Sequence, residues 1–263
     1  MVGLFGAAHP GPALAVTVVA ALLSVSADLS LGRAGLVVAA VAAGQLSIGW
    51  SNDLADARRD RLVGRSDKPL VTGAAGFGQV RAACALAVAS TVTLSLACGL
   101  AAGVIHLGAV AAGWVYNFGG KATWWSWLPY AVAFGALPVF IWTVPGASGP
   151  ARVWMAVAGG LLGVGAHLVN VLPDLADDEA TGVRGLPHRI GARWTPPVAV
   201  VVLVSATVVI VLGGPTVPTA ILVPAALVTL GLATLALAGR GRVPFRAAIG
   251  IAVVDVVMMV LAA

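Results

Sequence analysis

Long apolar segments, separated by short polar stretches, dominate the chain. Segments of about 17–25 mainly apolar residues are long enough to cross the hydrocarbon core of a bilayer, about 30 Å thick, as helices. Apolar and polar residues do not alternate within these segments, which argues against the strands of a β-barrel. The pattern therefore predicts an all-α, multi-pass membrane bundle that forms one domain over residues 1–263. Nine membrane-spanning helices are expected, at residues 11–29, 34–52, 79–98, 101–118, 127–145, 151–173, 195–213, 217–238 and 244–262.

The composition also indicates a membrane protein. Hydrophobic residues make up 60% and charged residues 10% of the chain, and the mean hydropathy is +1.00, whereas soluble domains carry about 45–50% apolar and about 25% charged residues. The net charge of +5 raises the question of nucleic acid binding. However, the basic residues lie between apolar segments, and the usual nucleic-acid-binding motifs are missing from the sequence. We therefore expect the lipid bilayer as a partner, and no nucleic acid.

The distribution of Lys and Arg predicts the orientation in the membrane, because cytoplasmic loops carry an excess of basic residues. With nine spans, one side of the membrane receives only Arg33 and Arg152. The other side, which also holds the amino terminus and the acidic residues discussed below, is therefore expected to be cytoplasmic. It receives the remaining basic residues: Arg58, Arg59, Arg61, Arg65, Lys68, Arg81, Lys121, Arg184, Arg189, Arg193, Arg240, Arg242 and Arg246.

A run of acidic residues follows directly on the second predicted span. Asn52, Asp56 and Asp60 are spaced i, i+4, i+8, and Asp53 lies three and seven residues before the two later carboxylates. Residues with this spacing share one face of a helix. A carboxylate at membrane depth costs about 2.5–3.5 kcal/mol on insertion scales, so a positive group is expected beside this face.

A second acidic run with the same spacing closes the sixth predicted span. Asn170, Asp174 and Asp178 are again spaced i, i+4, i+8, and Asp177 lies seven residues after the asparagine. Oxygen ligands without His or Cys favour a hard cation, and magnesium is the hard cation that proteins usually hold with a few carboxylates and substrate phosphates. We interpret the two runs as facing halves of one magnesium site. The alternative is two cytoplasmic surface loops whose acids and bases neutralise each other.

These residues resemble the signatures of the UbiA superfamily of intramembrane prenyltransferases. The first signature, N-D-x-x-D-x-x-x-D, is complete from Asn52 to Asp60, and nine helices is also the family's architecture. The second, D-x-x-x-D-x-x-x-G, is present as Asp174, Asp178 and Gly182. Two smaller features of the family also match, namely a basic residue before Pro-Leu and a tyrosine five residues before a lysine. They are Lys68-Pro69-Leu70, and Tyr116 with Lys121.

The resemblance implies Mg2+-dependent transfer of a prenyl group from an allylic isoprenyl diphosphate to a lipophilic or aromatic acceptor. It implies phosphate contacts by Lys68, Lys121 and one of Arg59 and Arg65, and it allows Tyr116 to line the prenyl channel. The residues implied as metal ligands are Asn52, Asp53, Asp56, Asp60, Asn170, Asp174, Asp177 and Asp178. Two positions depart from the family pattern, in which a basic residue and a threonine are common: Ala122 and Gly185.

Two other functions are compatible with this pattern. The family also includes intramembrane terpene cyclases, in which the allylic cation is captured within its own chain, and the short loops leave little room for an acceptor lid. An ion transporter would carry its acids near the bilayer midplane, whereas these acids lie at predicted helix ends. His188 is a candidate base on an acceptor, although a surface position in a basic loop is the simpler expectation. Asp255, alone in the last span, is a candidate functional acid by default.

Overall fold

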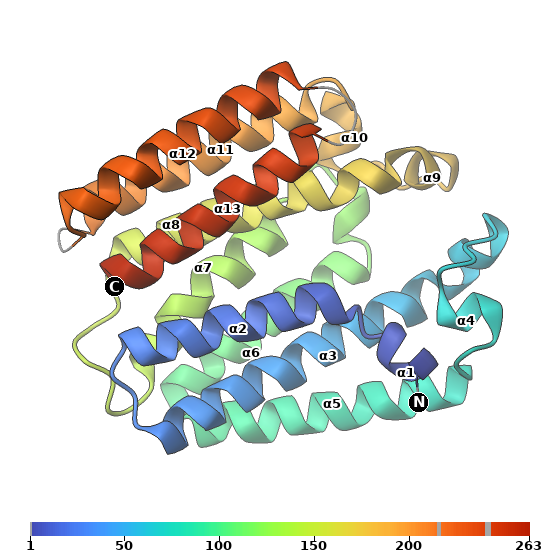
Figure 1. The fold of residues 1–263 in the computed structure, drawn as a ribbon. Helices are drawn as coiled ribbons and strands as arrows, with labels where there is room; N and C mark the ends of the chain where they lie inside the picture. Colours follow the sequence, from blue (N-terminus) through green and yellow to red (C-terminus); the bar gives the residue numbers. More distant parts are fainter. Residues whose placement is uncertain (1, 215–216, 240–242) are drawn as a thin grey trace. The chain divides into compact units, whose positions relative to one another are not determined.

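The computed structural model describes residues 2–214, 217–239 and 243–263, which form helices joined by turns, with no strand among them (Figure 1). The all-α class is thereby confirmed. The chain divides into two compact units: unit 1 contains residues 1–120 and 140–149, and unit 2 contains residues 121–139 and 150–263. The single domain over residues 1–263 stays a prediction.

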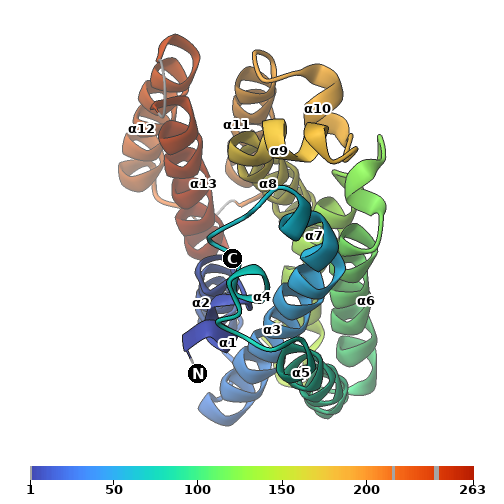
Figure 2. The same ribbon diagram turned by 90° about the vertical axis from the view of Figure 1, so that its right-hand side faces the viewer.

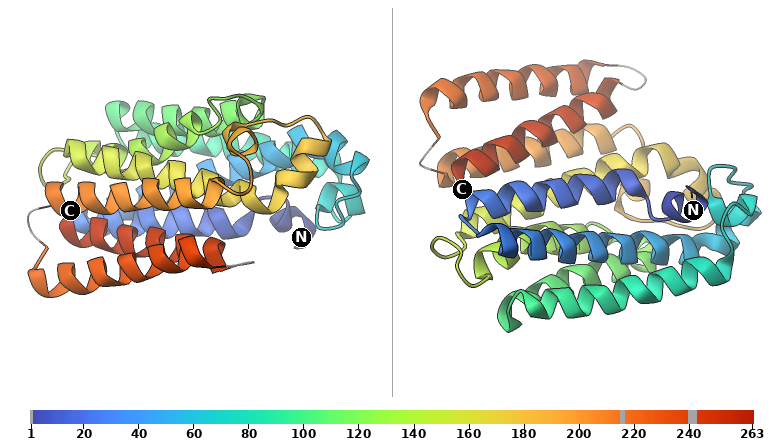
Figure 3. Two further views of the ribbon diagram at one scale, coloured as in Figure 1. Left: turned by 90° about the horizontal axis from the view of Figure 1, so that it is seen from above. Right: turned by 60° about the horizontal axis from the view of Figure 1, so that its bottom comes forward.

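Unit 1 is organised around its longest helix, α3, which contacts α2, α5 and α6. Figures 1 and 3 show α2, α3 and α5 running side by side. The short helix α4 contacts both α3 and the amino-terminal helix α1. The helices of this unit are α1 (Val2–Gly6), α2 (Pro10–Ser26), α3 (Leu31–Leu62), α4 (Pro69–Thr72), α5 (Phe77–Ala97) and α6 (Leu100–Asn117).

In unit 2, α8 contacts α11 and α13, and α12 contacts α13. Figure 2 shows α12 and α13 side by side. Helix α7 begins in this unit, and its last residues, from Phe140, belong to unit 1. The elements are η1 (Gly120–Ala122), α7 (Leu128–Thr143), α8 (Val153–Val171), η2 (Leu172–Asp174), α9 (Leu175–Ala180), α10 (Leu186–Ile190), α11 (Thr195–Gly213), α12 (Thr219–Ala238) and α13 (Val243–Ala262).

Glycines let the helices approach closely within each unit. This is expected in a membrane, where lipid is as apolar as the helix surfaces and helices associate through close packing at small residues. A Cβ added at Gly44 of α3 would lie 2.8 Å from the side chain of Val110 on α6. A Cβ added at Gly159 of α8 would lie 2.6 Å from the carbonyl oxygen of Phe134 on α7. Both contacts therefore depend on the missing side chain.

Among the described residues, seven helices are long and apolar enough to cross a membrane: α3, α5, α6, α8, α11, α12 and α13. Helices α2 and α7 are apolar but have 17 and 16 residues. The chain is thus a multi-pass integral membrane protein, and the count of nine spans stays a prediction.

Helix α3 continues past its apolar part and carries the first acidic run with it. The second predicted span ends at residue 52, whereas α3 ends at Leu62. Its 32 residues correspond to about 48 Å at 1.5 Å per residue, more than the hydrocarbon core of about 30 Å. A Schellman motif closes the helix, since Gly64 is left-handed (φ 68°) and the Arg65 amide donates to the Asp60 carbonyl (3.0 Å). The acids therefore lie on the last turns of the helix, away from its midpoint.

Candidate active site

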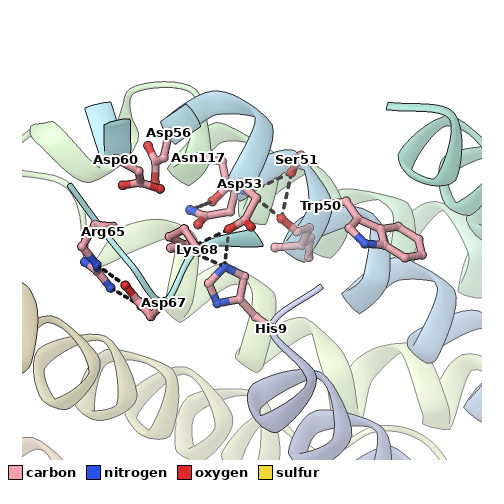
Figure 4. A network of polar contacts seen from close by, with 12 residues as sticks. His9, Trp50, Ser51, Asp53, Asp56, Asp60, Arg65, Asp67, Lys68 and Asn117 are labelled. Carbon is pink, nitrogen blue, oxygen red and sulfur yellow. Dashed lines mark hydrogen bonds and ion pairs between the residues drawn. The ribbon is translucent and has the colours of Figure 1, made fainter. Parts of the chain in front are cut away.

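The last turns of α3 bury the carboxylates of the first signature. Asp53, Asp56 and Asp60 are 2%, 6% and 2% exposed, and Asn52 is half-buried. Figure 4 shows Asp53 beside Lys68 and His9, and Asp56 beside Asp60. A buried carboxylate is costly unless it is paired or coordinates a cation, so the contacts of each one matter.

One oxygen of Asp53 is held by two basic side chains. The Lys68 ammonium, at the start of α4, donates to Oδ1 at 2.7 Å, and Nε2 of His9 lies 2.9 Å from the same oxygen. The Lys68 side chain is 11% exposed. Within the described residues, the buried Oδ2 atom accepts no hydrogen bond. Sequence reasoning placed Lys68 near the site and missed His9.

The two candidate arginines behave differently. Arg59 donates to Oδ2 of Asp56 (3.0 Å), and its Nε lies 3.8 Å from Oδ1 of Asp60, so its guanidinium belongs to the acidic face. Arg65 instead forms a two-pronged pair with Asp67, with distances of 2.8 and 2.9 Å. These hydrogen bonds lower the pKa of the largely exposed Asp67 to about 2.

Asn52 is oriented by an asparagine that sequence reasoning also missed. The Asn52 amide donates to Oδ1 of Asn117, at the end of α6, at 3.1 Å. The Asn117 amide in turn donates to the Ile48 carbonyl (2.9 Å) and to the Ser51 hydroxyl (2.8 Å). Because both amides are fixed by these bonds, α6 is tied to the first signature. The half-buried Tyr116 directly precedes Asn117.

The second signature does not lie on one uninterrupted helix. Asn170 belongs to the last turn of α8, Asp174 ends the 3-10 turn η2, and Asp178 lies in the short helix α9. Pro173 lies inside η2 and has no N–H to continue an α-helical ladder. The expectation that this run continues one regular α-helix is thus corrected, and its shared face stays a prediction. The Asp177 side chain lies outside the described residues.

His188 is buried against the second signature, although a surface position was expected. Its side chain is 5% exposed, and Nε2 lies 3.6 Å from Oδ2 of Asp178. Burial lowers the pKa of His188 below its ordinary value of 6.5, and the Asp178 charge opposes that shift. Nearby, the Ser126 hydroxyl lies 3.0 Å from Nε2 of His167 and accepts the Leu186 amide at 2.9 Å.

The remaining candidate residues have defined positions within their units. Half-buried Lys121 lies in η1, and a Cβ added at Gly185 would lie 2.5 Å from the Lys121 carbonyl oxygen. Asp255 is fully buried in α13 and accepts a hydrogen bond from Thr207 of α11 at 2.6 Å. That bond supplies the partner that the sequence did not identify for this acid.

The donors present fit a magnesium ion bound together with a ligand better than a complete protein cage. In the described part of the chain, three or more His, Cys, Asp or Glu side chains do not converge on one point. The donors are nevertheless hard oxygens, and Oδ2 of Asp53 is a buried acceptor that a cation would satisfy. Mg2+ is usually bound by one or two carboxylates with waters and substrate phosphates, which matches this incomplete set.

Comparison with known proteins identifies relatives over nearly the whole chain. The model of the UbiA prenyltransferase family matches residues 13–261. No curated protein sequence gives a match. A UbiA homolog from Archaeoglobus fulgidus, bound to GPP and Mg2+, is 15% identical with a TM-score of 0.72, and the match covers 99% of this chain and 100% of that one.

Two other solved structures have a similar fold. The apo UbiA homolog from Aeropyrum pernix K1 is 17% identical with a TM-score of 0.74, and 98% of this chain and 96% of that one are covered. A structure of digeranylgeranylglyceryl phosphate synthase in membranes is 14% identical with a TM-score of 0.73, and the coverage is 99% and 95%. At these identities the structures show a common fold.

Proposed function

The chain belongs to the UbiA prenyltransferase family, and on this premise we propose that it is a Mg2+-dependent intramembrane enzyme that ionises an allylic prenyl diphosphate and transfers the prenyl group to a lipophilic or aromatic acceptor. Family membership, with a fold like those of homologs bound to GPP or DMAPP and Mg2+, supports a prenyl diphosphate as the substrate. The acceptor and the magnesium dependence are the further parts of the proposal.

The observation that carries the proposal is the state of Asp53. One carboxylate oxygen is held by Lys68 and His9, while within the described residues the other is buried and accepts no hydrogen bond. A carboxylate fixed by one oxygen presents the second to a cation without further rearrangement. Magnesium bound there would neutralise the charge that develops on the departing diphosphate.

The proposed metal ligands come from both acidic signatures. They are Asn52, Asp53, Asp56, Asp60, Asn170, Asp174, Asp177 and Asp178. Lys68 and Lys121 would donate to phosphate oxygens, since ammonium groups bind phosphate as point charges. Arg59 is the better phosphate-facing arginine because it already contacts the acidic face, whereas Arg65 is engaged by Asp67. Tyr116, half-buried on α6, is proposed to line the prenyl channel.

Turnover by the purified protein tests this assignment. Protein in lipid nanodiscs is incubated with Mg2+ and prenyl diphosphates of several lengths, with and without an aromatic acceptor, and diphosphate release and products are measured. Asp56→Ala and Asp174→Ala should each abolish Mg2+-dependent turnover. The control Glu179→Ala removes an exposed acid that pairs with Arg184 (3.1 Å) and should retain it.

Two results would contradict the proposal. Retained Mg2+-dependent turnover in Asp56→Ala or Asp174→Ala would mean that the acids are structural. A cyclic hydrocarbon or alcohol formed without acceptor would replace the transferase assignment by a terpene cyclase.

We further propose nine spans, with the acidic signatures on the cytoplasmic side. The excess of Lys and Arg on the side that carries both signatures supports this orientation. Arg65 or Arg152 is replaced by a single cysteine in a chain without Cys84 and Cys98, and intact cells are treated with a membrane-impermeant maleimide. Only the cysteine at position 152 should be labelled. Labelling at position 65 would show the opposite orientation.

A further inference from the structure

The amino-terminal residues of the chain are docked against the first acidic signature. The Trp50 indole N–H on α3 donates to the Leu4 carbonyl at 2.9 Å. A Cβ added at Gly49 would collide with the carbonyl oxygen of Ala8, so backbone packs on backbone there. The same segment contributes to a hydrophobic cluster shared by α1, α3, α4 and α5: Leu4, Ala7, Trp50, Leu54, Ala57, Leu70, Ala75 and Val80. The amino-terminal segment is thereby held at the end of α3 that carries the acids.

His9 joins this docked segment to α2 in an uncommon backbone conformation. Its φ of 52° and ψ of 62° place it in the left-handed region, which residues other than glycine adopt in only about a few per cent of cases. The side chain caps no described backbone group of α2. It reaches Asp53 instead, with Nε2 2.9 Å from Oδ1 (Figure 4). The conformation is therefore associated with a contact to the signature, and not with helix capping.

The tautomer of His9 decides the direction of the hydrogen bonds around Asp53. Nε2 of His9 lies 2.9 Å from Oδ1 of Asp53 and 3.1 Å from the Lys68 ammonium. If Nε2 were unprotonated and accepted a hydrogen bond from Lys68, Nε2 and Oδ1 would be two acceptors 2.9 Å apart with no proton between them, which is unfavourable. If Nε2 carries the proton, both His9 and Lys68 donate to Oδ1, which has two lone pairs to accept them. Donation by both groups satisfies Oδ1 and leaves Oδ2 for another partner.

We propose that His9 is a positioning residue for the diphosphate site, and this inference rests on the function proposed above. His9 and Lys68 together fix Oδ1 of Asp53, so that Oδ2 is oriented toward the metal. The His9–Asp53 hydrogen bond also fixes the position of the carboxylate, and the carboxylate in turn orients the Lys68 ammonium toward the phosphate. The docked amino-terminal segment places His9, since Trp50 anchors it one turn before Asp53.

Substitutions of His9 separate positioning from general stability. His9→Asn tolerates the left-handed backbone but is too short to reach Asp53. His9→Gln offers an amide donor at nearly the reach of Nε2. The matched control is Thr17→Ala on α2, where the hydroxyl donates only to its own helix at the Ala13 carbonyl (2.7 Å) among the described contacts.

Binding of inorganic pyrophosphate with MgCl2 is the main readout, measured by isothermal titration calorimetry on the full-length protein in nanodiscs. A hydrogen bond to a charged group accounts for about 10-fold to 100-fold in affinity. His9→Asn should weaken binding by about that factor, His9→Gln should recover most of it, and Thr17→Ala should match the wild type. In turnover assays, KM for the prenyl diphosphate should rise more than kcat falls in His9→Asn.

The outcomes distinguish this inference from the function on which it rests. Wild-type protein that fails to bind magnesium pyrophosphate overturns both. Wild-type binding that is unchanged in His9→Asn, or lost equally in His9→Asn and His9→Gln, overturns the positioning role alone. A lower unfolding temperature in His9→Asn with unchanged affinity also overturns it. If His9→Asn does not fold, His9→Gly replaces it, because glycine accepts the same backbone conformation. His9→Gly should weaken the binding of magnesium pyrophosphate by the same factor.

Discussion

Replacing Lys68 with methionine removes the ammonium that lies 2.7 Å from Oδ1 of Asp53 while keeping most of the apolar stem. The Asp53 side chain is 2% exposed and the Lys68 side chain 11%, so water cannot replace the lost partner. Removing one member of a buried ion pair costs about 3–5 kcal/mol because the other charge is left uncompensated. His9 still contacts Asp53, so we expect a loss near the lower end, about 3 kcal/mol.

The assay is thermal unfolding in detergent without Mg2+, followed by tryptophan fluorescence. At about 2–4 °C per kcal/mol for chains of roughly this length, Lys68→Met should lower the midpoint by about 6–12 °C. The double variant Asp53→Asn/Lys68→Met contains no uncompensated charge at this pair, so it should be more stable than Lys68→Met alone. An unchanged midpoint in Lys68→Met, or a double variant that loses the sum of the two single losses, would refute the charge-compensation argument.

Three further substitutions test other contacts. Gly185→Ala should displace the Ser126 hydroxyl from its contacts with His167 and the Leu186 amide, since the added Cβ would lie 2.8 Å from that hydroxyl. The substitution should therefore lower the thermal midpoint. Asp67→Asn removes an exposed pair with Arg65, so its midpoint should stay within about 2–4 °C of the wild type, as expected for pairs that contribute about 0–1 kcal/mol. Burial lowers the pKa of His188 below 6.5, so the folded state favours neutral imidazole. Stability should therefore fall as the pH drops below about 6.5, and this slope should be smaller in His188→Asn, measured as the midpoint between pH 5 and 7.5.

The helices and the face of the first signature were predictable because they depend on local periodicity. The last span was expected at residues 244–262, and α13 runs from Val243 to Ala262. The spacing of the first signature implied that the helix continues past the predicted span through Asp60. Its end at Leu62 was not predicted, because hydropathy falls at the first charged residues whereas the helix ends at its glycine cap, Gly64. In the second run Pro173 lies in the 3-10 turn η2, so the matching spacing is not carried by one uninterrupted α-helix.

The contacts around the site were harder to predict because their partners are far apart in sequence. His9 lies 44 positions from Asp53, and Asn117 lies 65 positions from Asn52. The available signals were weak: His9 directly precedes the Pro-Gly-Pro sequence that begins α2, and Asn117 follows Tyr116. The expected surface position of His188 was wrong because a polar loop composition does not reveal that the imidazole packs beside Asp178.

The charge that offsets the acids of α3 comes from unit 1 itself. The sequence led us to expect a positive group beside the buried carboxylates, and magnesium was the candidate. In the structure, Lys68 and His9 contact Asp53, and Arg59 contacts the other two carboxylates. Each of the three carboxylates therefore faces a basic side chain that the chain itself supplies.

The same basic groups explain how a charged ligand could be bound at modest cost. In the proposed function, Mg2+ would bind Oδ2 of Asp53 while Lys68 and His9 keep their contacts with Oδ1, and the remaining N–H donors of Lys68 would bind phosphate oxygens. Each charge would then keep a partner of opposite sign, so binding would avoid stranding a desolvated ion, which costs several kcal/mol. Loss of Lys68 breaks this balance in both states. It should therefore reduce both the stability of the empty protein and its affinity for magnesium pyrophosphate.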